Sequence, residues 1–135
     1  MSEQLNTSEN NKRRSLLIVE DDDINLSVIV AFLSKEYDID SATSGLEAIE
    51  KANAKKYDAV LMDINLGSGI TGIEVTKELR NNADYANTPI LAITAFAMEG
   101  DKEEFLAAGC TDYISKPFTR SEILALLKKV FDSQG

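Results

Sequence analysis

Short apolar runs that alternate with amphipathic stretches are the feature that most limits how this chain can fold. Five apolar runs predict strands, and a stretch with apolar residues at helical spacing follows each of them. This alternation is typical of a parallel sheet covered by helices on both faces, and right-handed crossovers leave few topologies for it. We expect strands at residues 15–19, 39–42, 59–63, 89–94 and 112–115, and helices at about 24–35, 44–56, 71–80, 99–108 and 119–131.

Capping signals and helical spacing indicate where these helices begin and which residues they bury. In the second helix the spacing places Leu46, Ile49 and Ala52 on the inward face. The apolar positions of the first helix are Ile24, Val28, Ala31 and Phe32, and those of the last are Ile123, Leu126, Leu127, Val130 and Phe131. Three helices begin with the Ser/Thr and Glu pair of a capping box, namely Ser44 with Glu47, Thr71 with Glu74, and Thr119 with Glu122.

Length and composition restrict the class of protein. A chain of 135 residues with 44% hydrophobic residues fits one globular domain. Its net charge of -9 argues against a nucleic-acid surface, because phosphates would be repelled. The absence of His excludes catalysis or metal binding by His, and Cys110 alone cannot form an intrachain disulfide. No apolar run approaches the roughly 18 residues of a membrane span, so we expect a cytoplasmic protein that does not contact membranes.

The carboxyl ends of the expected strands collect the residues that could carry chemistry. Glu20 and Asp21 follow the first strand, Asp63 ends the third, Thr94 ends the fourth, and Lys116 follows the fifth. In a parallel sheet these ends share one edge, where open α/β sheets bind their ligands. Each residue also has an ordinary explanation, since Asp favours turns and acidic residues favour helix N-termini. Neither explains why two acids crowd together directly after the first strand.

Carboxylates without His or thiolate partners suit a hard cation. Mg²⁺ binds through one or two carboxylates together with water and phosphate oxygens. Such an ion would relieve the repulsion between the acids and neutralise charge on a phosphoryl group attacked by Asp63, since a carboxylate can accept a phosphoryl group. The Thr94 hydroxyl and the Lys116 ammonium group would bind the phosphoryl oxygens.

Four sequence motifs occur in order at these strand ends: Val19–Asp22, Leu61–Leu66, Ile93–Ala95 and Tyr113–Phe118. Together they resemble a response-regulator receiver domain of two-component signalling, over about residues 15–131. The resemblance implies a flavodoxin-like (βα)5 doubly wound parallel sheet of strand order 2-1-3-4-5. We accordingly expect residues 1–14, which end in Lys12, Arg13 and Arg14, to be a flexible tail, and residues 15–135 to form the receiver domain.

The resemblance also implies a role for each matching residue. Asp63 would accept a phosphoryl group from a phosphohistidine. Asp21, Asp63 and the backbone carbonyl of Asn65 would bind Mg²⁺ directly, and Glu20 would act through a metal-bound water. Thr94 and Lys116 would bind the phosphoryl group.

A conformational switch is implied as well. Thr94 and Tyr113 would change the surface of the fourth helix, fifth strand and fifth helix. Period two along the fifth strand points Tyr113 to the sheet face opposite Lys116, towards those two helices. The Lys116–Pro117 bond is expected to be cis. Residues lining the switching surface would be Ala97, Met98, Glu99 and Ile114.

Two departures from the family pattern stand out. Glu20 takes the place of the commoner Asp. The loop 66–72 lacks the usual Pro and is one residue longer than usual, which leaves its path open.

Partners and output follow from the resemblance and from where the chain stops. Phosphate would come from a sensor histidine kinase or a histidine phosphotransfer protein. The chain ends at Gly135 without an output domain, so output would be binding of a downstream protein or onward phosphotransfer. We expect no direct contact with nucleic acid, and a monomer, with dimerisation on phosphorylation left open.

Two other functions share parts of this residue set. A small Mg²⁺-dependent aspartyl-phosphate phosphatase would use the same groups, but enzymes resembling haloacid dehalogenases carry Asp-x-Asp on the first strand and need a cap. A flavin carrier of the same topology needs phosphate donors after the first strand, where Glu20, Asp21 and Asp22 would instead repel a phosphate. We therefore expect a phosphoacceptor that assists its own phosphorylation and dephosphorylation, and not a turnover enzyme.

Overall fold

The computed structural model describes residues 13–67, 69–95 and 100–134. Its single five-stranded sheet is parallel throughout, with strand order β2-β1-β3-β4-β5, which confirms the predicted topology. The strands are β1 (Ser15–Val19), β2 (Asp38–Ala42), β3 (Ala59–Asp63), β4 (Ile90–Thr94) and β5 (Asp112–Ser115).

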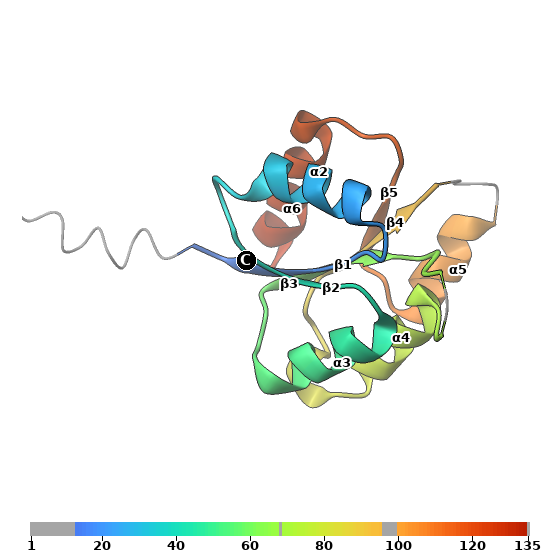
Figure 1. Ribbon diagram of the computed structural model, residues 1–135. Helices are drawn as coiled ribbons and strands as arrows, with labels where there is room; N and C mark the ends of the chain where they lie inside the picture. Colours follow the sequence, from blue (N-terminus) through green and yellow to red (C-terminus); the bar gives the residue numbers. More distant parts are fainter. Residues whose placement is uncertain (1–12, 68, 96–99, 135) are drawn as a thin grey trace, which may run out of the picture.

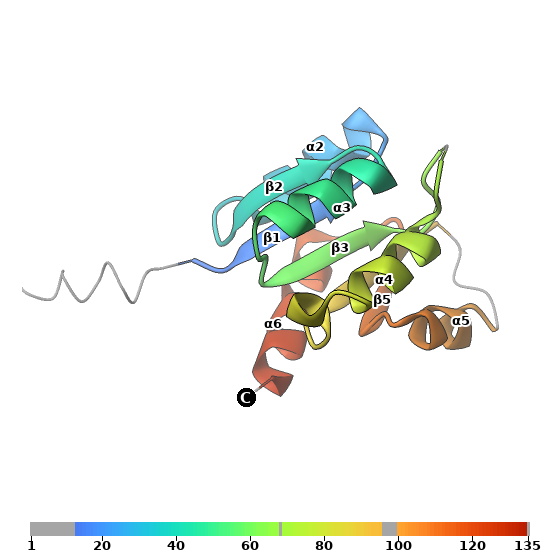
Figure 2. The ribbon, with the colours of Figure 1, turned by 90° about the horizontal axis from the view of Figure 1, so that it is seen from below.

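Helices cover both faces of the sheet, as Figures 1 and 2 show. On one face lie α2 (Asp23–Leu33) and α6 (Arg120–Ser133). On the other lie α3 (Gly45–Ala54), α4 (Gly72–Arg80) and α5 (Asp101–Ala108), and a short 3-10 turn, η1 (Ala83–Tyr85), follows α4. Among the described residues, no helix is both long enough and apolar enough to cross a bilayer.

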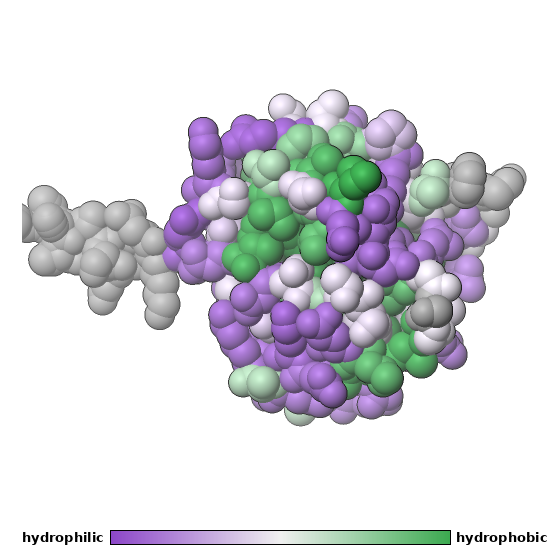
Figure 3. Space-filling view, viewed as in Figure 1, coloured by the Kyte–Doolittle hydropathy of each residue, from purple (hydrophilic) through white to green (hydrophobic). Residues whose placement is uncertain are grey.

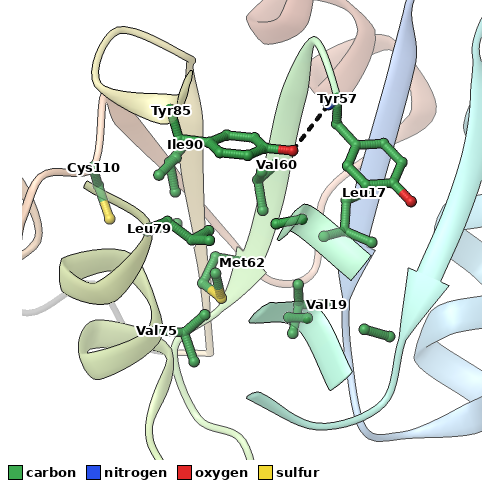
Figure 4. Close-up of a cluster of buried hydrophobic side chains, with 14 of the residues drawn as sticks. Leu17, Val19, Tyr57, Val60, Met62, Val75, Leu79, Tyr85, Ile90 and Cys110 are labelled. Atoms are coloured by element: carbon green, nitrogen blue, oxygen red, sulfur yellow. Dashed lines mark hydrogen bonds between the residues drawn. The ribbon is translucent and has the colours of Figure 1, made fainter. Parts of the chain in front are cut away.

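Alternate residues of the strands enter the two halves of the core. Leu16, Ile18 and Leu61 pack with residues of α2 and α6, whereas Val19 and Met62 pack on the opposite side. The second cluster, shown in Figure 4, is continued by side chains from α4, including Val75 and Leu79. Because β1, β3 and β4 are buried on both faces, they read as continuous apolar runs in the sequence.

The buried faces of two helices were only partly predicted. In α3, Ala52 is buried and Ile49 is partly buried, as predicted, but Leu46 is 68% exposed and Ala48 is buried instead, where its small side chain lets the helix approach the sheet closely. In α2, Ile24 is 73% exposed, whereas Ile29 is buried. That helix is apolar around most of its circumference, so periodicity alone did not identify the face that packs on the sheet.

Helix boundaries follow local capping chemistry. Thr71 with Glu74 and Thr119 with Glu122 form complete capping boxes, as predicted. In α3 only half of the motif forms, because the Glu47 carboxylate accepts a hydrogen bond from the Thr43 N–H. The described part of α5 begins at Asp101, and Glu99, where we expected that helix to begin, lies outside the described residues. The η1 turn was not predicted. In it the Asn82 side chain accepts a hydrogen bond from the Asp84 N–H, a local contact that leaves no periodic pattern.

Hydrogen bonds join the elements at the amino ends of the strands. The Tyr57 hydroxyl donates to Asp40, while the Tyr57 N–H donates to the Tyr85 hydroxyl (Figure 4). The Arg80 guanidinium donates to the carbonyls of Gly109, Tyr85 and Thr88, which ties the end of α4 to η1 and to the turn after α5.

Candidate functional site

Strand pairing brings the predicted site residues to one edge of the sheet. Asp63 is the last residue of β3 and Thr94 the last of β4, and each is 3% exposed. Glu20, which directly follows β1, is 1% exposed, and its N–H still donates to the Ala42 carbonyl. After β5, the Lys116 N–H donates to the Thr94 carbonyl at 2.8 Å. The parallel register therefore aligns all these strand ends.

The site contains more negative than positive charge. Glu20, Asp21 and Asp63 each offer a carboxylate oxygen within 4.8 Å of the other two. Lys116 Nζ lies 3.2 Å from Glu20 Oε1 and 3.6 Å from Asp63 Oδ2. One ammonium group thus faces two buried carboxylates, with a third carboxylate beside them that is exposed to solvent.

This crowding shows in the protonation of Glu20. Burial raises the pKa of its carboxyl to about 7, and a hydrogen bond with Asp63 and the charge of Asp63 act in the same direction. The Asp22 N–H and the Lys116 ammonium group lower this pKa, but they do not cancel the burial. Near neutral pH, without a cation, Glu20 therefore holds a proton for part of the time and can donate a hydrogen bond to the Asp63 carboxylate.

Backbone N–H groups fix the orientation of all three acids. The Asp22 N–H donates to Glu20, and the Asn65 N–H donates to Asp63 at 2.9 Å. Asp21 Oδ2 accepts from the Gly67 N–H at 2.7 Å. Sequence reasoning did not identify these three donors. Two of them lie two residues after the acid they bind, a local pattern typical of Asp in turns, whereas nothing in the sequence indicated the Gly67 contact.

Two glycines of the segment after β3 lie directly against the site. Ser68, in the same segment, is outside the described residues. At Gly67 an added Cβ would come within 2.5 Å of Asp21 Oδ2, and at Gly72 within 2.2 Å of the Asp63 carbonyl oxygen. At Gly72 the close neighbours are backbone atoms that cannot move aside, so only glycine fits there. Gly67 therefore lies against the Asp21 carboxylate, and Gly72 lies against the backbone of Asp63.

The donor set fits a small hard cation. It offers oxygen ligands, as Mg²⁺ prefers, and oxygens bound at about 2.1 Å lie up to about 4.2 Å apart across an octahedron. The carboxylate oxygens lie within 4.8 Å of one another, so small changes in the side-chain torsions would bring them to this geometry. A cation would also favour the ionised form of Glu20 and offset the repulsion among the acids.

The predicted switch residue Tyr113 lies on the α3–α5 side of the sheet. Its half-buried ring contacts Phe105 of α5 at a centroid distance of 6.2 Å. The expected contact with the fourth helix, α5, is therefore present. The last helix, α6, packs on the opposite face, so Tyr113 does not point towards both helices. Ile114 packs on that opposite face as well.

Two further expectations concern the surroundings of Lys116. The Lys116–Pro117 peptide bond is cis, as predicted. Ala97, Met98 and Glu99, expected on the switching surface, lie outside the described residues.

Comparisons with known proteins point to one family. Residues 16–128 match the response regulator receiver domain. The polar-differentiation response regulator DivK of Brucella ovis is 37% identical over 116 residues, which cover 85% of this chain and 94% of DivK.

Solved structures agree with this match. The chemotaxis protein CheY4 of Vibrio cholerae is 30% identical, with a TM-score of 0.84 over 87% of this chain and 98% of that protein. The receiver domain of a sensor histidine kinase from Pseudomonas aeruginosa PAO1 is 37% identical, with a TM-score of 0.80 over 87% of this chain and 96% of that domain. That structure has a magnesium ion coordinated in its active-site cleft.

The raised pKa of Glu20 predicts that the metal-free protein loses stability as pH rises. Between the ordinary pKa of 4.5 and the raised value near 7, the unfolded chain loses the Glu20 proton while the folded protein keeps it, so stability falls as pH rises. Glu20→Gln removes this cost. Chemical denaturation in EDTA should show the variant more stable than wild type by about 2 kcal/mol at pH 8, and the difference should shrink towards pH 5.

The same substitution at Glu50, an exposed residue of α3, controls for the change in net charge. A wild type and a Glu20→Gln variant whose stabilities differ by the same amount at every pH would contradict this account of the site.

Proposed function

This chain belongs to the response regulator receiver domain family, and from that premise we propose that Asp63 accepts a phosphoryl group from a phosphohistidine. The donor would be a sensor histidine kinase or a histidine phosphotransfer protein. The observation that carries the proposal is the position of the Asp63 carboxylate at the end of the central strand, with Lys116 Nζ 3.6 Å away and two further carboxylates beside it.

We further propose that Mg²⁺ binds to Asp21, Asp63 and the backbone carbonyl of Asn65, with Glu20 acting through water. Among the described residues, no backbone donor bonds to the Asn65 carbonyl, which supports its part in the set. When bound, the ion would supply positive charge against the phosphoryl oxygens and the acids. The oxygen-only donor set and the raised pKa of Glu20 support a site that favours an added cation.

The chain's own residues then have distinct tasks in the transfer. A carboxylate oxygen of Asp63 forms the new bond to phosphorus as the bond to the imidazole nitrogen breaks, and the bonding pair stays on the imidazole. Lys116 offsets the charge of the transferred group, and the Thr94 hydroxyl donates to one of its oxygens. Burial of Asp63 limits the access of water to the acyl phosphate. Lys116 and Thr94 would stabilise the same charge when water attacks the acyl phosphate, so the protein would assist its own phosphorylation and dephosphorylation, while burial of Asp63 slows the second step.

An exposed apolar surface beside the site supports docking of the donor. Ile24 is 73% exposed and Val28 45% exposed on α2, and Figure 3 shows hydrophobic surface over that helix. Val28 also lines a small hollow of about 160 Å³ together with Lys116 and Phe118. Unpaired apolar surface of this kind marks interaction sites. We propose that a helix of the phosphodonor covers it and brings its phosphohistidine to Asp63.

The output proposal is a shift in the surface formed by α5, β5 and α6. A phosphoryl group on Asp63 gives the Thr94 hydroxyl a partner that only the phosphorylated state has, and a switch needs such a difference between two states. Movement of Thr94 would free space next to the Tyr113 ring, which now packs against Phe105. A downstream protein would read the rearranged surface.

The first prediction concerns the acceptor. With Mg²⁺ and acetyl phosphate, intact mass should show one added phosphate on wild type and none on Asp63→Asn, and EDTA should abolish the addition. Asp84→Asn, at an exposed position, is the matched control and should gain the phosphate. Full incorporation in Asp63→Asn would overturn the assignment, and turnover of a chromogenic phosphate ester would indicate a phosphatase instead.

The second prediction concerns docking. Ile24→Ala should slow phosphotransfer from a phosphorylated donor by about 5- to 10-fold, the size expected for removing an interface anchor. Leu46→Ala removes a similarly exposed side chain, 68% exposed, from the opposite face, and should leave the rate unchanged. Labelling by acetyl phosphate should be equal in both variants. Equal transfer rates from the donor would exclude the α2 surface as the docking site.

The third prediction concerns the switch. Thr94→Ala should still accept phosphate, but beryllofluoride should shift the NMR signals of Tyr113 much less than in wild type. The signals of Tyr37 and Tyr57 serve as internal references. A wild-type change at Tyr113 in this variant would show that the coupling does not depend on the Thr94 hydroxyl.

A further inference from the structure

A second surface lies at the end of the sheet opposite the carboxylate site. An open groove of about 820 Å³ runs between the residues preceding β1, the turn after α2, and α6. Figure 1 shows these segments meeting at one end of the molecule. Strands of five residues separate this end from the site by about 13 Å or more, at about 3.3 Å per residue.

The groove is locally basic although the chain carries a net charge of -9. Its lining includes Arg13, Arg14, Lys35 and Lys128 against two carboxylates, Glu36 and Asp132. Both carboxylates are already engaged, Asp132 by Lys128 at 3.4 Å and Glu36 by Arg120 at 3.4 Å.

Two of the groove's cations have no carboxylate partner among the described residues. Lys35 and Arg14 form no ion pair there, whereas Arg13 lies near Asp38 and donates to the Ser34 carbonyl. Positive charge is therefore left over at this surface after the internal pairs are formed.

The floor of the groove is apolar and aromatic. The rings of Tyr37 and Phe131 lie 6.0 Å apart, and Leu124 and Ala125 of α6 extend the surface. The Arg14 guanidinium lies 4.2 Å above the Phe131 ring and holds the rim of the groove against the helix. A ligand here would meet an apolar base between basic walls.

From this arrangement we propose that the groove docks an acidic segment of a partner protein that carries an apolar anchor side chain. One carboxylate of the segment pairs with Lys35, a second displaces Asp132 from its exposed pair with Lys128, and the anchor packs on Tyr37 and Leu124. The net charge of the chain disfavours nucleic acid as the occupant, because long-range repulsion acts on the whole polyanion. A short acidic segment meets mainly the local field, since salt screens charges more than about 8 Å away.

The position of the groove would allow docking without blocking the phosphorylation site. It lies away from Asp63, from the exposed face of α2 and from Tyr113, so a partner held here leaves the phosphorylation site accessible. Docking is therefore independent of phosphorylation and tethers the domain near a partner in both states.

Fluorescence anisotropy on the full chain tests the proposal. The probe is a short labelled peptide of Glu and Leu with one central Phe, and its matched control has Gln in place of Glu. Wild type should bind the acidic probe at least about 10-fold more tightly than the Gln probe, and Lys35→Glu/Lys128→Glu should lose about 10-fold in affinity, with a weaker effect at high salt.

Charge reversal on another surface provides the protein control. Lys77→Glu/Lys102→Glu changes two exposed residues of α4 and α5 by the same charge and should bind like wild type. Circular dichroism of both double variants checks that they fold. Beryllofluoride should leave the affinity of wild type unchanged.

Three results would overturn the proposal. They are equal binding of the two probes, equal losses in the two double variants, and a beryllofluoride-dependent affinity. None of them bears on whether Asp63 accepts phosphate, so this proposal and the proposed function can fail separately.

Discussion

Repulsion among three neighbouring carboxylates, two of which share one lysine, is the constraint on which the rest of this structure depends. Glu20 and Asp63 are nearly inaccessible to solvent, and within the described part of the chain Lys116 is the cation that pairs with each of them. The fold offsets part of this cost with backbone dipoles, because each acid accepts a hydrogen bond from a main-chain N–H. What remains is an excess of negative charge, which is compatible with a bound Mg²⁺ ion, and such an ion would reduce the repulsion among the acids.

The two ends of the sheet divide stability and reactivity between them. At the amino ends of the strands, hydrogen bonds from Tyr57, Tyr85 and Arg80 join the elements into one network. Such buried, satisfied polar groups favour one well-defined arrangement. At the carboxyl ends, the side chains are held in an arrangement that costs free energy without a ligand. Stabilising contacts at one end thus allow an unfavourable charge arrangement at the other.

The sequence predicted the positions of the strands and of the residues at their carboxyl ends. It did not predict the buried faces of two helices or the contacts of the loop after β3, which depend on three-dimensional packing. Continuous apolar runs located β1, β3 and β4, and the regular alternation of short strands with helices located β2 and β5. The shared direction of the strands placed Asp63 and Lys116 at one edge without any side-chain detail. Leu46 was wrongly predicted to face the core, and no buried face was predicted for α2, where Ile24 is exposed. In both helices more than one stripe of apolar residues could pack on the sheet. The path of the loop that contains Gly67 was left open, since the contact of Gly67 with Asp21 spans 46 positions and has no local signature.

The attachment of α5 gives this helix a mechanical role. Arg80 binds the Gly109 carbonyl where the helix ends, and the Cys110 N–H donates back to the Phe105 carbonyl there. At the other end Gly100 provides no side-chain cap. The helix is thus a lever with its fulcrum at Gly109. With eight residues it is about 12 Å long, so a rotation of about 10° at the fulcrum moves its first turn by about 2 Å. In the proposed switch, a small event at the carboxyl end of β4 would in this way be magnified at the surface of α5.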